Sequence, residues 1–238
     1  MENDINKRDW VGGKRPRSVR TIGTTRRSVS GFFIFKGEKS IPYESGLERD
    51  FLIRLSLSRF VNDIISQPVQ LKYLATNGNS YRYTPDYLVY FDVNSGPTWH
   101  QSLAPLLVEV KPREKIRKEW AKMRPRCTEA IRYANAQGWK YHIYDESRIR
   151  DQRFQNIMFL QRYKRMQFSN EESQWIIANL KAMGQAPFDY LLARHFFGSQ
   201  DKAVGISHLW HLLYSGAIEC DLSLPLNNNT ILWVPAHD

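Results

Sequence analysis

A carboxylate inside an apolar run is the feature that most constrains the fold. The run LLVEV, residues 106–110, is typical of a strand covered on both faces, yet it contains Glu109 and is followed by Lys111. A buried charge is costly unless it is paired or bound to a metal ion. The side chain of Lys111, two residues further on, points to the same face of the sheet. The chain must therefore fold so that Glu109 gains a partner.

The segments around this run predict an α/β protein. They are, in chain order, a strand at 31–37, a helix that opens at 40–42 and ends near Arg59, strands at 65–75, 81–91 and 104–111, a helix from Arg113 to Gly138 that is interrupted or kinked at Pro125, and a strand at 139–145. Asn77-Gly78 is a hairpin turn between the first two strands of the trio. The order predicts a helix, a three-stranded meander, a second helix and a last strand.

This order brings chemically useful side chains to one sheet edge. Asp86 begins the middle strand of the meander, and Glu109 and Lys111 end its neighbour. Two carboxylates and an ammonium suit Mg²⁺, which prefers oxygen ligands, with Mn²⁺ able to substitute. Such a site can hydrolyse a phosphodiester, in which Lys111 orients or deprotonates the attacking water or neutralises charge on the phosphate.

Pro85-Asp86 followed by Glu109-Val110-Lys111 resembles the PD-(D/E)XK signature of restriction-endonuclease-like nucleases, whose core has the same element order. The surrounding motifs are similar to those of the TnsA endonuclease subunit of heteromeric cut-and-paste transposases. These motifs are SGLE at 45–48, QP at 67–68, TPDYLV at 84–89 and EVKP at 109–112. The resemblance covers about residues 30–145 and, more weakly, the remainder.

The resemblance implies a catalytic set of Glu48, Asp86, Glu109 and Lys111, with Glu48, Asp86 and Glu109 as metal ligands. It also implies cleavage of the non-transferred (5′) strand at double-stranded transposon ends. The implied partners are a DDE transposase subunit (TnsB-like) and an ATP-dependent regulator (TnsC-like), in a prokaryotic cytoplasm and on the nucleoid. Some members of that family have Gln at the position of Glu109.

Other interpretations of these residues stay open. Ser45 and Glu48 also form a capping-box pattern, in which both side chains would serve the start of a helix, and Glu44 is a second candidate for the same metal ion. Glu109 and Lys111 could be an ion pair at a strand end. The chain could therefore be a stand-alone restriction- or repair-type nuclease, or a non-catalytic DNA-binding adaptor with the same fold.

Charge is divided unevenly along the chain. The net charge is +10, but residues 169–238 contain seven acids and three bases, a balance of −4, so that residues 1–168 hold +14. A basic excess favours a polyanionic partner. Seven bases crowd the helix after Lys111 and are predicted to contact the DNA backbone: Arg113, Lys115, Arg117, Lys118, Lys122, Arg124 and Arg126. Residues 1–30 are predicted to be a basic flexible arm.

The two halves predict a nuclease domain at 31–168 and a second domain at 169–238. Three helical segments there precede strands at 217–224 and 230–234, which predicts a small winged-helix-like domain whose acidic balance favours protein partners. His208 and His211 with Cys220 are a weak zinc pattern, and one face of an amphipathic helix explains the histidines better. Without a long apolar run or a secretory signal, we expect a cytoplasmic protein.

Overall fold

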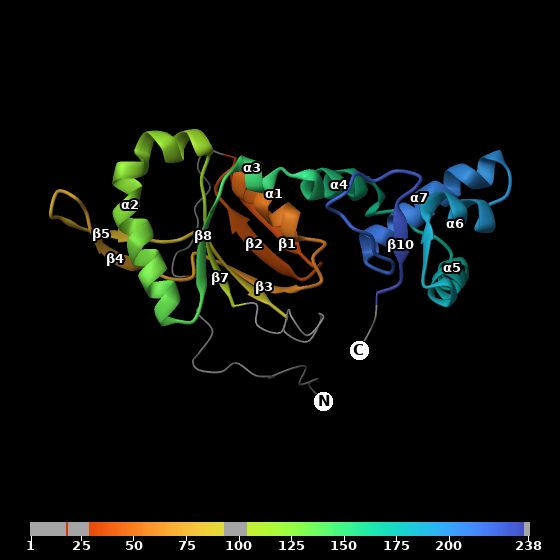
Figure 1. Cartoon of the computed structure of the whole chain (residues 1–238), viewed down its shortest axis with the longest axis horizontal. Coiled ribbons are helices and arrows are strands. Elements are labelled where there is room, and N and C mark those ends of the chain that lie inside the picture. Colours follow the sequence, from red (N-terminus) through yellow and green to blue (C-terminus); the bar gives the residue numbers. More distant parts are fainter. Residues whose placement is uncertain (1–17, 19–28, 93–103, 236–238) are drawn as a thin grey trace, which may run out of the picture.

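The computed structural model describes residue 18 and residues 29–92 and 104–235 (Figure 1). Most of the predicted basic arm, and the segment that joins the second and third strands of the predicted meander, lie outside the described residues. The elements of the N-terminal part are β1 (Gly31–Phe35), β2 (Lys39–Tyr43), α1 (Gly46–Leu55), β3 (Val61–Ser66), β4 (Leu71–Leu74), β5 (Ser80–Tyr83), β6 (Tyr87–Phe91), β7 (Leu106–Val110), α2 (Arg113–Ala136) and β8 (Lys140–Tyr144).

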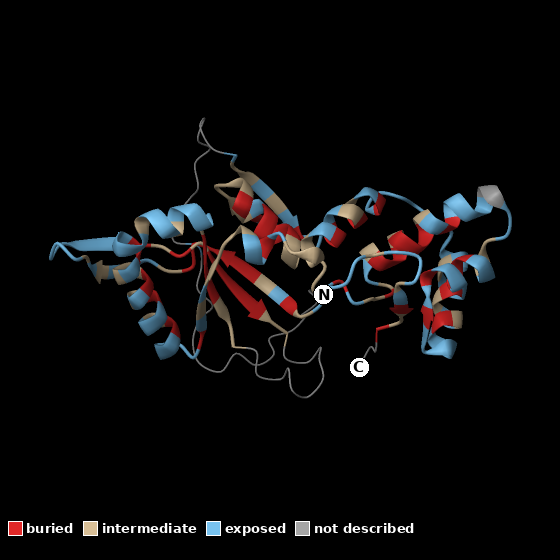
Figure 2. Cartoon of the chain, turned by 45° about the horizontal axis from the view of Figure 1, so that its top comes forward, coloured by how far each residue is buried: buried red, intermediate tan, exposed pale blue. Residues whose placement is uncertain are grey.

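A four-stranded sheet in the order β3-β6-β7-β8 forms the centre of this part. β6 pairs antiparallel with β7, as predicted for the second and third strands of the meander, and also with β3, which shares only residues 65–66 with the first predicted strand. β8 pairs parallel with β7, and α2 makes the crossover that such a pair requires. The central strands are buried along their length (Figure 2). The sequence-predicted α/β core is thus present.

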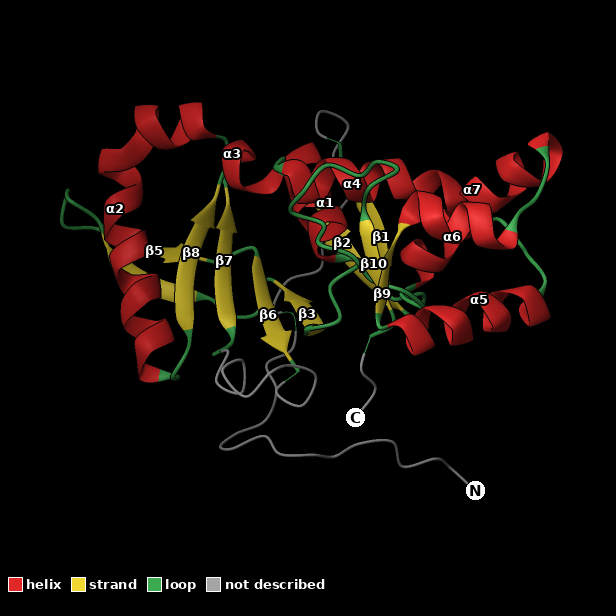
Figure 3. Cartoon of the chain, turned by 45° about the vertical axis from the view of Figure 1, so that its right-hand side comes forward, coloured by secondary structure: helices red, strands yellow, loops and turns green. Residues whose placement is uncertain are grey.

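The sheet is covered on both faces, as the apolar run of β7 requires. On one face, Phe51 and Leu52 of α1 and Ile41 of β2 pack with Val108 of β7. On the other face, the second half of α2 packs on the sheet, with Ala130 and Ala134 fully buried. Figure 3 shows α2 beside β8, and the C-terminal helices at the opposite end of the molecule. Glu109 points to the face that α2 covers.

The first predicted helix begins later and ends earlier than expected. Residues 39–43 form β2, which pairs with β1, because Lys36 (φ 49°) and Gly37 (φ 79°) make a tight turn with both φ angles positive. α1 starts only at Gly46, after the cap at Ser45, and ends at Leu55 rather than near Arg59. The Pro42 pattern that resembles a helix start thus belongs to a strand.

The first two predicted strands are each divided. Gln67 has φ 46° and Pro68 has no N–H, so β3 ends at Ser66 and the chain leaves the central sheet. β4 then pairs with β5 around Gly78, which confirms the Asn-Gly hairpin turn. β5 and β6 are separated by residues 84–86. The hairpin β4–β5 therefore forms a separate two-stranded sheet.

α2 is one continuous helix with Pro125 inside it. Proline lacks the N–H that would bond to the carbonyl of Ala121, and Figure 1 shows the helix bent, which confirms the predicted kink. The buried residues of α2 lie from Met123 onward. Gly138, with φ 72°, follows the helix in the conformation that commonly ends helices.

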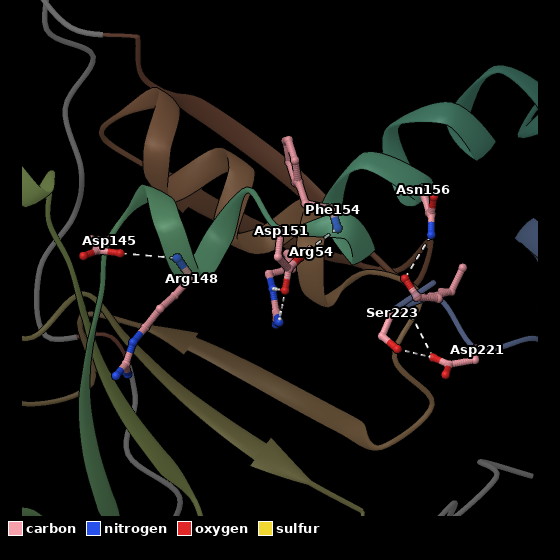
Figure 4. A network of polar contacts seen from close by, with 9 residues as sticks. Arg54, Asp145, Arg148, Asp151, Phe154, Asn156, Asp221 and Ser223 are labelled. Atoms are coloured by element: carbon pink, nitrogen blue, oxygen red, sulfur yellow. Dashed lines mark hydrogen bonds and ion pairs between the residues drawn. The ribbon is translucent and has the colours of Figure 1, made fainter. Parts of the chain in front are cut away.

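Two short helices that were not predicted from the sequence connect the N-terminal and C-terminal parts. They are α3 (Glu146–Ile149) and α4 (Gln152–Leu160). Asp151 caps α4 through the N–H of Phe154 and accepts hydrogen bonds from Arg54 of α1 at 2.6 and 3.1 Å (Figure 4). Ile157 and Leu160 belong to the apolar cluster of the C-terminal helices. α4 is therefore tied to α1 and packed with the C-terminal part.

The C-terminal part consists of the 3₁₀ turn η2 (Gln161–Tyr163), α5 (Asn170–Met183), β9 (Gln185–Pro187), α6 (Phe188–His195), α7 (Ser199–Ser215) and β10 (Ile231–Trp233). Ser169 caps α5 as predicted, since its hydroxyl accepts from the N–H of Glu172. The predicted hairpin of 217–224 with 230–234 is confirmed at one position, where Glu219 and Trp233 exchange two backbone hydrogen bonds. These segments share only the bridge between Glu219 and Trp233, and β10 pairs with β9 instead.

After the bridge at Glu219, the chain bonds to side chains rather than to a second strand. The side chain of Asn156 donates to the carbonyl oxygens of Leu222 (2.9 Å) and Leu224 (2.7 Å), and the carboxylate of Asp221 accepts from Ser223 (Figure 4). Both interactions bend the chain away from an extended strand. None of the helices in the described ranges is long and apolar enough to span a membrane.

Candidate active site

Glu109 is buried, with 3% of its surface exposed, and finds its partners within the protein. Its Oε2 accepts a hydrogen bond of 2.8 Å from the hydroxyl of Tyr83. Its Oε1 lies 3.3 Å from Nζ of Lys111 and 3.3 Å from a guanidinium nitrogen of Arg126. Two cations and a hydroxyl therefore compensate the charge that the apolar run of β7 encloses.

Asp86 lies immediately before β6 and is held by the backbone of β7. Its N–H donates to the carbonyl of Val108 (2.9 Å), and its Oδ2 accepts from the N–H of Val110 (2.7 Å). Burial raises the pKa of Asp86 well above its usual value, and the charges of Glu109 and Glu48 raise it further. Lys111 opposes this shift of the pKa. The four predicted site residues are thus close enough to interact electrostatically.

Glu48 occupies the first turn of α1 and forms a variant of the capping box, in which its carboxylate accepts from the N–H of Glu44 rather than from that of Ser45. Its N–H donates to Oγ of Ser45 (3.2 Å), and its carboxylate accepts from the N–H of Glu44 (2.8 Å) and the hydroxyl of Ser45 (2.8 Å). The same carboxylate lies 3.3 Å from the hydroxyl of Tyr87 on β6. Burial raises the pKa of Glu48. The helix-cap function is therefore present in the structure, at a place from which the carboxylate also acts on Asp86.

The donor set fits a hard divalent cation in kind. Among the described residues, Oδ1 of Asp86 has no hydrogen-bond donor, and two further carboxylates raise the pKa of Asp86, so a cation would relieve repulsion at this position. Within the same residues, no three His, Cys, Asp or Glu side chains converge tightly enough to form a ready-made metal cluster. The side chain of Glu109 is turned toward Tyr83 and Arg126.

The weak zinc pattern has a structural explanation. His208 is fully buried, its ring stacks on Phe168 with centroids 4.3 Å apart, and its Nε2 lies 2.8 Å from the hydroxyl of Ser173. Nδ1 of His211 lies 2.9 Å from the carbonyl oxygen of Tyr163. Both histidines face the C-terminal core, as an amphipathic helix predicts.

The seven basic residues of α2 fall into two groups. Most are exposed along the first half of the helix: Arg113, Lys115, Arg117, Lys118, Lys122 and Arg124. Lys118 pairs with Glu114 at 2.6 Å, an exposed ion pair of little consequence for stability. Arg126 differs, because its side chain points to Glu109 and lies against the ring of Tyr83. The helix thus presents a basic surface next to the carboxylates.

Sequence reasoning did not anticipate Tyr83, which reaches Glu109 from the hairpin β4–β5. Burial raises the pKa of Tyr83, and the charge of Glu109 raises it further, so the group stays a hydroxyl donor. The place of Arg126 was readable from its spacing. It lies three residues after Met123 and four before Ala130, both of which are buried, and so shares the inward face of α2.

A central mixed sheet flanked by helices, with acidic residues and a lysine at one edge, fits the fold class of an α/β nuclease. Residues 58–146 match the family described as TnsA-like endonuclease N terminal, and residues 148–222 match TnsA endonuclease C terminal. The chain belongs to the TnsA-like endonucleases, which confirms the resemblance seen in the motifs. The first match contains Asp86, Glu109 and Lys111 but not Glu48. Comparison with individual curated proteins gave no match.

Proposed function

We propose that the chain is the Mg²⁺-dependent endonuclease subunit of a transposase and hydrolyses the non-transferred (5′) strand at transposon ends. Membership of the TnsA-like endonucleases supports nuclease activity and a function in transposition. The observation that carries the proposal is the convergence of Asp86, Glu109 and Lys111 at one sheet edge, where Val110 donates to Asp86 at 2.7 Å and Lys111 lies 3.3 Å from Glu109. Carboxylates that repel one another beside Lys111 are suited to share a divalent cation.

In this proposal Asp86, Glu109 and Glu48 hold the metal ion. Mg²⁺ held by these residues would supply polarisation of the phosphodiester and a more acidic bound water. The N–H of Val110 keeps the carboxylate of Asp86 oriented, since it donates to Oδ2 at 2.7 Å. The ammonium of Lys111, 3.3 Å from Oε1 of Glu109 and partly exposed, lies at the edge of the site and donates to an oxygen of the scissile phosphate.

The exposed bases in the first half of α2 track the backbone of the duplex. They begin two residues after Lys111 and crowd one segment of helix, an arrangement that suits phosphate contacts. Contacts of this kind position DNA without reading its sequence. The choice of site then comes from the DDE transposase subunit (TnsB-like) and the ATP-dependent regulator (TnsC-like).

The C-terminal part is proposed to be winged-helix-like and to bind these protein partners. Its order of helices and strands, α5-β9-α6-α7-β10 with the bridge from Glu219, supports the fold assignment. Residues 169–238, from the cap of α5 onward, carry a net charge of −4, which disfavours DNA. Trp175, Tyr190 and Phe197 line one open pocket and are exposed, as aromatic anchors for a protein partner would be.

The test is cleavage of strand-labelled transposon-end DNA in the presence of Mg²⁺ or of a chelator, with and without the transposase subunit. We expect a nick in the 5′ strand that requires Mg²⁺ and the transposase. The variant Asp86→Asn should bind DNA but not cut it, which makes it the matched control. Cutting by the chain alone would favour a stand-alone nuclease, and no cutting with any partner would favour a DNA-binding adaptor.

A further inference from the structure

Arg126 occupies a different environment from the other bases of α2. Its side chain is 23% exposed, whereas that of Lys118 is 72% exposed. It lies on the stripe of α2 that also contains the buried Met123, Cys127 and Ala130, which turns it toward the sheet. A phosphate of the DNA backbone would have to reach into this packed face to contact it. The sequence-based assignment of Arg126 to the DNA surface therefore does not suit its place in the fold.

The contacts of Arg126 converge on Glu109 together with those of Tyr83. A guanidinium nitrogen of Arg126 lies 3.3 Å from Oε1, and the hydroxyl of Tyr83 donates to Oε2 at 2.8 Å. The guanidinium carbon lies 5.2 Å from the centre of the Tyr83 ring, so the two side chains also support each other. The hydroxyl of Tyr141 lies 3.2 Å from that of Tyr83. Groups from β5, α2 and β8 thus fix one carboxylate.

These contacts determine which acceptor positions on the Glu109 carboxylate stay free for a ligand. A carboxylate has about four acceptor positions, two on each oxygen. Lys111 and Arg126 both approach Oε1, and Tyr83 takes one position on Oε2, so Oε2 keeps the free position. The terminal torsion of a glutamate is otherwise soft, so a carboxylate without donors would sample many orientations.

We propose that Arg126 and Tyr83 are positioning residues that orient the carboxylate of Glu109 for the divalent cation, and that Arg126 does not contact DNA. The inference rests on the proposed function, because it requires Glu109 to be a metal ligand. Donors behind a metal ligand typically change metal affinity or activity by about 10- to 100-fold when they are removed. Arg126 and Tyr83 are such donors on the two oxygens of one ligand.

The test measures Mg²⁺ binding without DNA, by calorimetry and by the rise in unfolding temperature with Mg²⁺ concentration. Arg126→Gln and Tyr83→Phe should each weaken Mg²⁺ binding by about 10- to 100-fold. Arg126→Lys keeps a cation at this place and should recover part of the loss. Tyr83→Phe keeps the shape of the ring, so it reports on the hydroxyl even where Arg126→Gln unfolds the protein.

DNA binding in the presence of a chelator supplies the second readout. Arg126→Gln should bind transposon-end DNA as wild type does, with the same dependence on salt. The matched control is Arg124→Gln on the exposed side of α2, which should weaken DNA binding and leave Mg²⁺ binding unchanged. If Arg126→Gln and Tyr83→Phe both bind Mg²⁺ with wild-type affinity, this inference is wrong and the proposed function still stands. Wild-type protein that binds no Mg²⁺ overturns the proposed function as well.

Discussion

At the scale of single residues, ionisation of Asp86 lowers the free energy of unfolding. Burial, then the charges of Glu109 and Glu48, raise its pKa well above the usual value. A carboxyl group whose pKa is higher in the folded than in the unfolded state binds its proton more tightly when folded. The free energy of unfolding therefore falls as the pH rises from about 4 through the raised pKa. Asp86 thus destabilises the metal-free protein at neutral pH.

Asp86→Asn should raise the unfolding temperature of metal-free protein and abolish cleavage. Asparagine keeps an oxygen that accepts from the N–H of Val110, but it cannot ionise. The gain should be present at about pH 8 and vanish toward about pH 4, where Asp86 of the wild type is protonated. Thermal unfolding across this range in a chelator measures it. A lower unfolding temperature than wild type at the alkaline end would contradict the prediction.

The two functions of Glu48 can be separated by a pair of variants. Glu48→Gln keeps a capping-box residue but removes the charge, so it should preserve stability and lose Mg²⁺-dependent cleavage. Ser45→Ala removes the cap and should cost about 1 kcal/mol while cleavage persists. Denaturant unfolding and the nicking assay give both readouts. Full cleavage by Glu48→Gln would show that Glu48 caps the helix and is not needed as a metal ligand.

The sequence predicted that Glu109 needs a partner, and this need is met by Tyr83, Lys111 and Arg126. Lys111 was readable because residues two apart in a strand share a face. Tyr83 was not, because its approach depends on the chain leaving the sheet at Gln67, where φ is 46°. The membership of these residues in a metal site stays a prediction.

At the scale of elements, the first half of α2 should bind DNA through phosphates. Replacing Lys115, Arg117 and Lys122 by Glu should weaken binding to all DNA sequences alike and flatten the salt dependence, by about one unit of slope for each phosphate that the helix no longer neutralises. A matched control reverses three exposed bases of the C-terminal part, Lys181, Arg194 and Lys202, and makes the same change in net charge. DNA-binding titrations at several salt concentrations compare the two triple variants. Equal effects would show that the bases of α2 do not contact DNA specifically and are an ordinary solvated surface.

The elements themselves were predictable to different degrees. The pairing of β6 with β7 followed from strand patterns, the Asn-Gly turn predicted the separate hairpin β4–β5, and β8 and α2 were recognised with nearly their observed ends. β2 was missed because Ser40-Ile41-Pro42 resembles the start of a helix, whereas the preceding turn at Lys36 and Gly37 turns this segment back onto β1. The hairpin near residue 220 is limited to the bridge between Glu219 and Trp233, and the side chain of Asn156, distant in sequence, donates to the carbonyl groups of Leu222 and Leu224 beyond it.

At the scale of the whole molecule, α4 joins the halves. Its residues Ile157 and Leu160 share an apolar cluster with Leu180 and Leu209 of the C-terminal helices. The sequence placed a domain boundary near Phe168 from charge and helix signals, and such signals do not reveal which core a preceding helix joins. The family match for the C-terminal part begins at residue 148.

A fragment of residues 147–238 should therefore fold better than one of residues 169–238. The shorter fragment loses two side chains that are fully buried, Ile157 and Leu160, each worth about 1.5–3 kcal/mol of burial. Circular dichroism and thermal unfolding of both fragments test this. We expect a cooperative transition for the longer fragment, and an equally stable shorter fragment would support the predicted boundary near Phe168.

The bend at Pro125 has a consequence for local opening of the backbone. Before Met123, the described part of α2 buries no residue, and a helix of about ten residues is marginal by itself in water. Amide hydrogens of residues 116–122 should therefore exchange with solvent far faster than those of residues 127–134, which pack on the sheet. Bound DNA should slow exchange in the first half alone. Contacts between its basic side chains and the phosphates would then supply the stability that packing on the sheet gives the second half.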